Sequence, residues 1–515
     1  MILDFGSQLH YLIALLPESI LAVAAIAALL AGVFGRVREG RSPGRTAAGL
    51  ALLGVVASAA ANAWLLTVEV PGRSGMIAVD TFRVAANFLF LGATLLGILF
   101  AFDYLRREGL DLGEFYALVL LATVGMMLLA GARDLIMVFM GLELMSISIY
   151  VLASMNRRDP RSAEAGLKYF LIGAFASGFL LYGIALLFGA TGSTNLALVT
   201  AEVVRGAGSG NPLLVAGLGL LLVGFAFKIS AVPFHMWTPD AYEGAPTPVT
   251  GYMAAGVKAA AFLALVRIVT VELAPAAAVW QTVLWWLAVL SMIVPNLVAL
   301  VEDNVKRMLA YSSIAHAGYL LVGVVSAGAL GRAASIFYLA VYAAMTLGAF
   351  AIVYVVAGEG DRRGKLADYR GLGWRRPLLA ASLVVFLLSL AGFPPTGGFV
   401  GKLYLLRAAL DAGEVTLAIT LVLTSFISYY YYLRVVWKMY FEDAPEDLPL
   451  PAPAGLAFRV AAGVSVLAIL GSGVFPGLAL RGAERVGADL QPRLVVPLEG
   501  PAAPVEVEAE PTRAD

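Results

Sequence analysis

Residues 225–237, FAFKISAVPFHMW, place Lys228 and Pro233 inside an apolar stretch that is long enough to cross a bilayer. Proline has no N–H group, so Pro233 cannot bond the carbonyl of Ile229. The sequence therefore predicts that this turn of the helix opens in the middle of a membrane span.

A second apolar stretch is interrupted in a similar way. The run SLAGFPPTGGF at residues 389–399 holds Pro394 and Pro395 between glycines, which predicts a larger break. Interrupted segments at matching positions in two halves of a chain indicate a transporter fold built from a repeat. Backbone groups freed at membrane depth need protein or water beside them, so we expect both breaks to line a cavity.

The composition is that of a polytopic membrane protein. Hydrophobic residues make up 60% of the 515 residues and charged residues only 14%, whereas soluble domains carry about 25% charged residues. The formal net charge of +0 gives no reason to expect nucleic acid as a partner. Cysteine is absent and there are 3 histidines, which excludes disulfides and thiolate metal sites and argues against a histidine-built haem or metal site.

Apolar windows of about 20 residues predict an all-α protein of about fourteen transmembrane helices. The first helix is expected to be retained, because it has no basic region or small-residue cleavage site of a signal peptide. Helices 4 to 8 and 9 to 13 would form two five-helix repeats, each with one broken helix, and the odd number of helices inverts the second repeat. The predicted spans are 9–34, 44–68, 81–104, 114–132, 134–154, 163–190, 212–238, 247–270, 276–300, 307–327, 332–357, 377–408, 414–440 and 456–480.

This pattern divides the chain into five parts. Residues 1–112 hold helices 1 to 3, residues 113–272 the first repeat, and residues 273–441 the inverted second repeat. Residues 442–482 hold helix 14. Residues 483–515 are rich in Pro, Ala and Glu without periodicity, so we expect them to be disordered.

Basic residues gather in loops on one side of the predicted membrane. They follow helices 1, 5 and 11, whereas the opposite loops hold isolated basic residues such as Arg73, Arg133 and Arg332. The positive-inside rule makes the basic side cytoplasmic and puts both termini outside. The basic residues of the three loops are Arg36, Arg38, Arg41, Arg45, Arg157, Arg158, Arg161, Arg362, Arg363, Lys365, Arg370, Arg375 and Arg376.

Four ionisable side chains lie near the middle of predicted helices: Glu143, Lys228, Lys258 and Lys402. A charge at that depth costs at least about 2.5–3.5 kcal/mol, so a chain that carries several needs an internal polar path. Burial disfavours a charged lysine and a nearby carboxylate favours it. Charge movement along such a row therefore switches each lysine between holding and releasing a proton.

Further polar residues have both a structural and a relay interpretation. Lys168, near the end of helix 6, either reaches the membrane interface or joins the path. His316 either forms an interhelical hydrogen bond or carries protons, and His235 either bonds the carbonyls freed by the first break or does the same. Glu143 and Lys228 are alternatively a static buried ion pair.

Lys306 and Arg307 lie in a short basic turn before helix 10. We therefore expect this pair to set the topology of the chain rather than to join the relay.

Four segments point to a known family. Together they resemble the antiporter-like membrane subunits of respiratory complex I, a family shared with Mrp-type cation/proton antiporters and membrane-bound hydrogenases. The resemblance covers roughly residues 10–480. The segments are GLELMSISIYVLAS (141–154), FKISAVPFHMWTPDAYEGAPTPVTGYMAAGVKAAAF (227–262), EDNVKRMLAYSSIAHAGYLL (302–321) and AGFPPTGGFVGKLYLL (391–406).

Three features separate this chain from two subunit types of that family. They are the opening LPESILAVAA at residues 16–25, Lys402 where the M-type subunit carries a glutamate, and no candidate after residue 480 for the long lateral helix of the L-type subunit.

The resemblance implies a proton-translocating subunit of NADH:quinone oxidoreductase that performs no catalysis as an isolated chain. In the family pattern, Glu143 pairs with Lys228 of broken helix 7, Lys258 connects the two halves, and Lys402 of broken helix 12 exchanges protons with the far side. The resemblance also implies that this chain binds no cofactor, with NAD, FMN, iron–sulfur clusters and quinone in partner subunits. The expected partners are the M-type, K, J and A subunits in the lipid bilayer of a bacterial inner membrane.

Two other function classes stay open. The chain is alternatively a subunit of an Mrp-type cation/proton antiporter or a membrane-bound hydrogenase, or an inert scaffold that kept the fold. The charges in mid-membrane argue against a scaffold because they would be costly without a role. Only family detail separates the first two classes.

Overall fold

The computed structural model describes residues 8–35, 43–68, 75–207, 210–446 and 448–490. Within these ranges the chain is helical, and β-structure is limited to three isolated bridges. Thirteen of the described helices are long and apolar enough to cross a membrane. The remaining predicted crossing is broken helix 12. Its halves, α17 (Pro377–Ala391) and α18 (Gly397–Asp411), are each too short to cross a membrane alone. The all-α membrane fold is confirmed.

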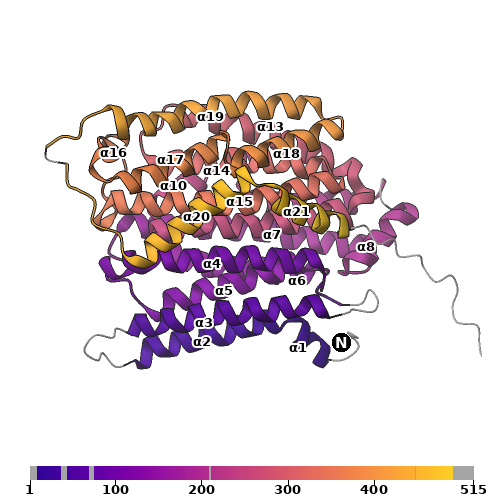
Figure 1. Ribbon diagram of the computed structural model, residues 1–515. Coiled ribbons are helices and arrows are strands. Elements are labelled where there is room, and N and C mark those ends of the chain that lie inside the picture. The colour runs from indigo at the N-terminus through magenta and orange to yellow at the C-terminus, as the bar shows by residue number, and fades with distance from the viewer. Residues whose placement is uncertain (1–7, 36–42, 69–74, 208–209, 447, 491–515) are drawn as a thin grey trace, which may run out of the picture.

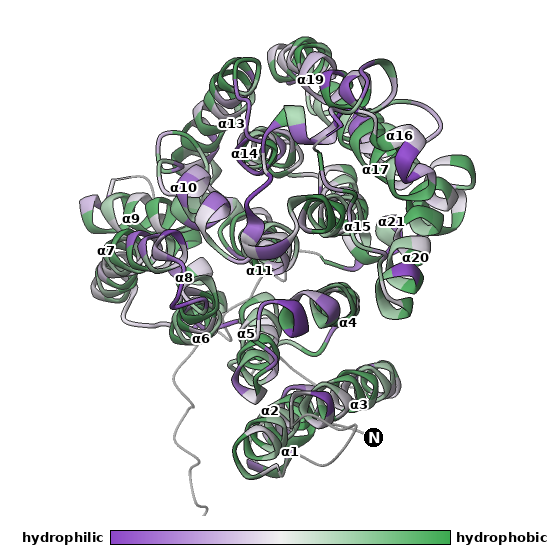
Figure 2. Ribbon diagram, turned by 90° about the vertical axis from the view of Figure 1, so that its left-hand side faces the viewer, coloured by the Kyte–Doolittle hydropathy of each residue, from purple (hydrophilic) through white to green (hydrophobic). Residues whose placement is uncertain are grey.

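The N-terminal helices form a layer on one flank of the molecule (Figure 1). The predicted first span is divided at Leu15, which does not continue the helix. The helices of this layer are α1 (Gln8–Ala14), α2 (Leu16–Phe34), α3 (Pro43–Trp64) and the 3₁₀ turn Leu65–Thr67, whereas α4 (Thr81–Arg107) lies beside the helices that follow it (Figure 2).

The next group corresponds to the predicted first repeat. Asp134, Asp159, Asn195 and Asn211 each accept a hydrogen bond from a backbone N–H of the helix that they precede, which explains where four of these helices begin. The elements are α5 (Gly113–Gly131), α6 (Leu135–Ala153), α7 (Pro160–Thr191), α8 (Leu196–Glu202), the π-helical turn Val203–Ala207, α9 (Pro212–Ile229), α10 (Thr238–Gly244), α11 (Thr247–Tyr252), the π-helical turn Met253–Val257, α12 (Lys258–Arg267) and the π-helical turn Ile268–Glu272.

The C-terminal half holds the remaining helices. They are the 3₁₀ turn Ala274–Ala276, α13 (Ala277–Ala299), α14 (Val305–Val325), α15 (Ala329–Ala357), the 3₁₀ turns Glu359–Asp361 and Leu366–Tyr369, α16 (Leu372–Arg375), α17, α18, α19 (Val415–Phe441), α20 (Leu456–Val474) and α21 (Gly477–Asp489).

Three spans form the centre of the molecule. Viewed end-on, α11, α14 and α15 are surrounded by the other helices (Figure 2). In the most apolar stretch of the span from α11 to residue 272, 100% of the residues are buried. In the corresponding stretch of α2, only 28% are buried. Charged residues on the central helices are therefore shielded by protein, and the outer helices present apolar side chains to their surroundings.

The loops after helices 5 and 11, which were expected to share one side of the membrane, lie at one end of the bundle. Arg161, at the start of α7, donates a hydrogen bond to the carbonyl of Gly360 after α15 at 3.0 Å. We call this the basic end; it lies at the left of Figure 1. Arg36, Arg38 and Arg41 of the first basic loop lie outside the described residues.

The predicted boundary of the disordered tail is wrong for residues 483–489. Those residues belong to α21, which packs on α15: a Cβ atom on Gly487 would lie 2.9 Å from the backbone nitrogen of Ala333, and Arg332 donates to the Gly487 carbonyl at 2.9 Å. This close packing stabilises a helix that the composition did not indicate. Residues 491–515 lie outside the described residues.

Candidate functional site

The first break lies at the turn before Pro233, as the sequence predicted, but it is longer than one opened turn. Helix α9 ends at Ile229 because Ser230 adopts a left-handed conformation, with φ of 63°, and α10 begins only at Thr238. Pro233 is exposed in the connecting segment. The sequence had located the break correctly within the span, but the left-handed residue rather than the proline terminates the helix.

Protein groups satisfy the backbone at this first break. The N–H of Val232 donates to the Ser291 hydroxyl of α13 at 2.8 Å, and the indole of Trp237 donates to the Phe227 carbonyl at 3.3 Å. Such partners replace water where a membrane helix is interrupted.

The second break follows the prediction more closely. Helix α17 ends at Ala391, Gly392 takes a left-handed φ of 84°, and Pro394 and Pro395 lie before the first residue of α18. The Tyr429 hydroxyl donates to the Gly392 carbonyl at 3.0 Å. The freed backbone groups were expected to meet protein or water, and at these positions they meet protein: the side chains of Ser291, Trp237 and Tyr429 bond them. No cavity is needed to satisfy these groups.

Lys402 crosses the second break. It lies on α18, is buried, and its Nζ donates to the carbonyl of Ala391, the last residue of α17, at 2.8 Å. The carbonyl end of a helix carries partial negative charge, so this position favours an ammonium group. Lys402 Nζ also lies 4.7 Å from the centre of the Tyr319 ring, which is a cation–π distance.

Lys258 begins α12 directly after the π-helical turn Met253–Val257. Turns of this kind widen a helix and are frequent at functional sites. The buried Lys258 Nζ donates to the Ser313 carbonyl on α14 at 2.6 Å and also contacts the Ser313 hydroxyl. The Tyr342 hydroxyl of α15 donates to the same Ser313 oxygen at 2.9 Å. Ser313 thus joins three central helices.

His316 continues this polar chain along α14. One ring nitrogen lies 2.7 Å from the Tyr338 hydroxyl and the other 3.3 Å from the Tyr432 hydroxyl, which also bonds Ser312. The His316 ring packs against Tyr319, the residue under Lys402, with ring centres 5.4 Å apart. Buried hydroxyl and imidazole groups therefore connect the surroundings of Lys258 with those of Lys402.

Lys228 lies in a different environment. It is 3% exposed, and its Nζ has no hydrogen-bond partner and no ion pair among the described residues. The rings of Tyr150 and Tyr169 have their centres 5.1 and 5.3 Å from this nitrogen. Cation–π contacts therefore stabilise Lys228 where no hydrogen bond does.

Glu143 and Lys228 are not in direct contact. The half-buried carboxylate of Glu143 accepts a hydrogen bond from Ser177 of α7. Ser177 and Lys228 line the same small crevice, together with Tyr150. This crevice has no room for a water molecule. The static ion pair considered from the sequence is not formed, and Glu143 acts on Lys228 only through its electric field.

An aromatic stack separates Lys228 from Lys258. Trp237 lies flat on Tyr169, with ring centres 4.0 Å apart, and meets the edge of Tyr242 at 6.3 Å. The Tyr242 hydroxyl in turn lies 3.5 Å from the Ser313 hydroxyl that Lys258 contacts. The two lysines are therefore linked by rings rather than by a continuous series of hydrogen bonds.

Lys168 belongs to an ion network at the basic end. Its Nζ pairs with Glu164 at 2.7 Å and with Asp240 at 2.9 Å, and Asp240 also pairs with Arg307 at 2.9 Å. Burial opposes ionisation of Asp240, but the hydrogen bonds from Lys168 and Arg307 outweigh it and hold its pKa below the ordinary value. This network holds α10 between α7 and α14, which is the structural interpretation of Lys168.

His235 lies half-buried in the segment between α9 and α10. Its Nδ1 atom has no hydrogen-bond partner among the described residues. In the described part of the chain, His235 forms no hydrogen bond or ion pair with any of the four proposed relay residues.

Two charged residues of this region were not identified as candidates from the sequence. Lys306, read there as a topology determinant, is only 4% exposed and pairs with Asp361 at 3.6 Å. Asp361 lies in the loop after α15, where nothing in the sequence distinguished it. The signal that could have singled out Lys306 is its place directly before a predicted membrane span that itself carries Ser313 and His316.

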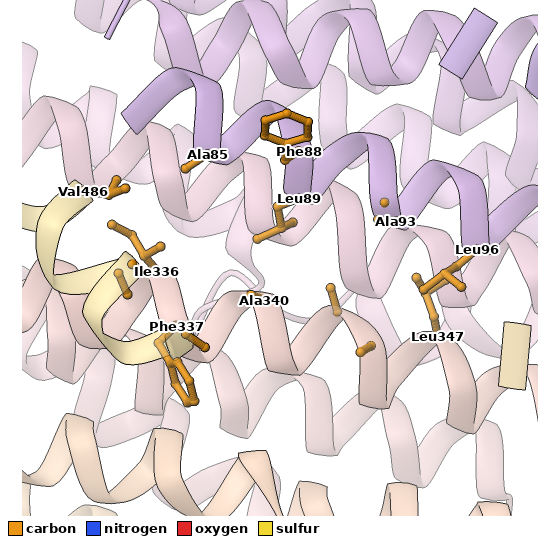
Figure 3. A pocket seen from close by; sticks show the side chains of 16 residues that line it. Ala85, Phe88, Leu89, Ala93, Leu96, Ile336, Phe337, Ala340, Leu347 and Val486 are labelled. Atoms are coloured by element: carbon orange, nitrogen blue, oxygen red, sulfur yellow. The ribbon is translucent and has the colours of Figure 1, made fainter. Parts of the chain in front are cut away.

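The apolar pockets lie apart from these residues. One of about 500 Å³ lies between α4, α15 and α21 and is lined by side chains such as Phe88, Leu89, Leu96 and Phe337 (Figure 3). None of its lining residues is ionisable at neutral pH, so it does not belong to the row of lysines. Among the described residues, no group of three or more His, Asp or Glu is placed to hold a metal ion.

Sequence comparison gives close matches along most of the chain. The family described as "NADH:quinone oxidoreductase/Mrp antiporter, TM" matches residues 132–428. NADH-quinone oxidoreductase subunit N of Trichlorobacter lovleyi is 48% identical over 476 residues, which cover 92% of this chain and 96% of that protein. The subunit N of Gemmatimonas aurantiaca is 45% identical over 505 residues, or 95% of each chain.

Comparison with solved structures agrees with these matches. A chain of respiratory complex I from Thermus thermophilus with bound aureothin has a TM-score of 0.75 and 37% identity, covering 90% of this chain and 98% of that one. A chain of the Mrp complex from Dietzia sp. has a TM-score of 0.81 and 24% identity, covering 93% and 97%. The second likeness shows the fold alone.

Proposed function

We propose a proton-translocating role in NADH:quinone oxidoreductase for this chain, because it belongs to the NADH:quinone oxidoreductase/Mrp antiporter family of membrane proteins. Its relatives that match over more than nine-tenths of the chain carry the name subunit N. The observation that supports proton transfer is the series of buried polar groups from Lys258 through Ser313 and His316 to Lys402.

Each residue is assigned a step in proton transfer according to its contacts. Glu143 sets the local electrostatic potential at Lys228. The Lys228 ammonium contacts tyrosine rings and has no hydrogen-bond acceptor among the described residues, so no acceptor holds its protons. Lys258 passes a proton to the hydroxyls around Ser313, and His316 accepts and releases it between Tyr432 and Tyr338. Lys402 then exchanges a proton with the far side, because it lies at a break where the helix ends.

A lysine suits this task better than an arginine. Its ammonium releases a proton when burial and neighbouring charges disfavour the charged form, whereas a guanidinium stays charged. Movement of one charge against 100 mV costs about 2.3 kcal/mol, which is within the range that such neighbours supply.

The redox chemistry belongs to other subunits in this proposal. The chain has no cysteine for an iron–sulfur cluster, so NAD, FMN, the clusters and quinone are assigned to partners, and the isolated chain is not a catalyst. We place it beside the M-type, K, J and A subunits of a bacterial inner membrane. The basic end is assigned to the cytoplasm and both termini to the outside.

An Mrp-type antiporter is the alternative role. It has the weaker support, because the match to the Mrp chain rests on 24% identity, whereas named complex I relatives reach 48%. We therefore assign the chain to complex I.

The test is to purify the tagged chain from its native membrane and to measure NADH-driven proton pumping by the assembled complex. We expect it to co-purify with NADH:quinone oxidoreductase activity. Lys228→Ala should leave assembly intact on native gels and lower pumping, whereas Lys365→Ala, at an exposed lysine of the basic end, should pump normally. Co-purification with a cation/proton antiporter instead, or normal pumping by fully assembled Lys228→Ala, would contradict the proposal.

A further inference from the structure

A buried carboxylate closes the basic end of the central helices. The Asp361 side chain is 9% exposed. Its Oδ2 atom accepts hydrogen bonds from the Thr247 backbone at 3.2 Å, the Thr247 hydroxyl at 2.6 Å and the Tyr104 hydroxyl at 3.3 Å. Asp361 thus caps α11, the segment that leads to Lys258, from a distant part of the chain.

The partner of this carboxylate is an equally buried lysine. Lys306 Nζ lies 3.6 Å from Asp361 Oδ2 and donates to the Ala245 carbonyl at 2.9 Å. Both charges are therefore held between α10, α11 and α14. A topology-determining lysine would instead be expected in contact with solvent or lipid headgroups.

The second oxygen of Asp361 is free of hydrogen bonds. Asp361 Oδ1 is buried and has no hydrogen-bond partner among the described residues; Arg107 lies 4.0 Å from it. A buried acceptor left in this way costs about 1–3 kcal/mol. Such a cost at a charged atom calls for an explanation other than cohesion of the fold.

Asp361 also lines a small polar pocket that leads outward. The pocket has a volume of about 10 Å³, which is about the space that one water molecule needs. Exposed Arg161 and half-buried Asp159 at its rim belong to the start of α7 at the basic end. The charged and titratable groups around the Asp361–Lys306 pair are Tyr104, Arg107, Glu108, Asp159, Arg161, Glu243 and Tyr369.

The same pair faces the row of lysines on its inner side. Lys306 and Ser313 lie two turns apart on one face of α14, a separation of about 10 Å along the axis. Tyr242, three residues before the carbonyl that Lys306 bonds, reaches toward the Ser313 hydroxyl. Polar groups therefore extend from the rim of the pocket to Lys258.

We infer that the Asp361–Lys306 pair is the proton-uptake site of the basic end and that it supplies Lys258. This inference rests on the proposed proton-translocating function. It goes further in giving a role to two residues outside the row of Glu143, Lys228, Lys258 and Lys402.

The transfer conserves protons and charge at each step. Asp361 Oδ1 takes one proton from a hydronium ion that reaches the pocket, which leaves a water molecule, and becomes a carboxylic acid. Lys306 gives one ammonium proton through Tyr242, Ser313 and intervening water to the neutral amine of Lys258. The acid then returns its proton to the Lys306 amine, which restores the carboxylate and the ammonium while one proton has moved inward.

A purely structural pair makes a different prediction. Removing one member of a buried ion pair leaves an unpaired charge and is strongly destabilising, whereas replacing both members with uncharged groups is often neutral. A double variant therefore separates the two roles: it should repair a structural pair but cannot repair an uptake site.

The experiment measures pumping and quinone reductase activity of the assembled complex in native membrane vesicles. We expect Asp361→Asn to lower pumping by about 100-fold, the lower end of what a positioned proton-transfer group contributes, and Asp361→Glu to retain part of it. The double variant Asp361→Asn with Lys306→Met should assemble on native gels and still fail to pump. Added formate, a small acid that can enter the pocket, should restore part of the activity of Asp361→Asn.

The control is Asp443→Asn, at an exposed aspartate of the same end, which should behave as the wild type. Wild-type pumping by assembled Asp361→Asn, or by the double variant, overturns the uptake site. If the wild-type complex itself moves no protons, the proposed function fails instead, so the two failures are distinguishable.

Discussion

Lys402 and Ala391 are joined across a helix break. The lysine lies on α18, yet its ammonium donates to the carbonyl that ends α17, at 2.8 Å. Gly392 permits this crossing, because a Cβ atom there would lie 2.8 Å from the Lys402 side chain and its φ of 84° suits glycine. The lysine is thus fixed to the break rather than only near it.

Substitution of Lys402 tests whether proton release or fixed charge matters. Lys402→Arg keeps the positive charge but cannot release a proton at working pH. We expect both Lys402→Arg and Lys402→Ala to lose pumping in proteoliposomes that contain the assembled complex, with better assembly for the arginine variant. Wild-type pumping by Lys402→Arg would show that this residue supplies only charge and that protons leave elsewhere.

Ser313 is the hydroxyl shared by Lys258 and Tyr342. Ser313→Ala removes the hydroxyl through which Lys258 exchanges protons, so we expect pumping to fall by about 100-fold. Ser313→Thr, which keeps a hydroxyl, should retain part of the rate. Ser326→Ala is the control, because the one hydrogen bond of the Ser326 hydroxyl among the described residues goes to the Val322 carbonyl in the last turn of α14. Equal rates for Ser313→Ala and Ser326→Ala in vesicle assays would exclude the role.

Glu143 should act through its charge. Because it bonds Ser177 and not Lys228, Glu143→Gln should leave the complex assembled while it removes the field that favours protonated Lys228. We expect pumping to decrease in the order wild type, Glu143→Asp, Glu143→Gln, with exposed Glu446→Gln as a normal control. Equal loss of assembled complex for both Glu143 variants on native gels would instead indicate a structural role.

Asp80 gives a pH dependence that concerns stability rather than transport. Burial opposes its ionisation, but two hydrogen bonds from Arg267, both 2.8 Å long, lower the pKa of Asp80 from 3.8 to about 2. A lowered folded-state pKa contributes stability that is fully present above pH 3.8 and is lost as the pH falls toward 2. The contribution is about 2 kcal/mol.

We therefore expect Asp80→Asn to lower the unfolding temperature of the detergent-purified complex at pH 5 and to have a smaller effect near pH 2. Thermal unfolding followed by tryptophan fluorescence at several pH values measures this difference. A destabilisation that is the same at all pH values would assign the effect to lost shape rather than to lost charge.

Hydropathy was sufficient to predict most of the helices. The predicted spans 114–132 and 134–154 correspond to α5 (Gly113–Gly131) and α6 (Leu135–Ala153). A membrane span needs about 20 apolar residues in a row, and this property is local to the chain. The burial of Lys228, Lys258 and Lys402 followed from the same reasoning, because each is a charge surrounded by apolar sequence.

The sequence by itself thus determined the membrane setting, most of the helices, the positions of the breaks and the burial of Lys228, Lys258 and Lys402. Tertiary structure alone decided their partners: Lys258 meets Ser313 from 55 residues away, Lys306 meets Asp361, and Glu143 meets Ser177 instead of Lys228. It also decided that Ser230 ends α9 and that α21 packs on α15. The reason is that crossing a bilayer depends on the summed hydropathy of neighbouring residues, whereas a hydrogen bond depends on how separate helices pack and rotate against one another.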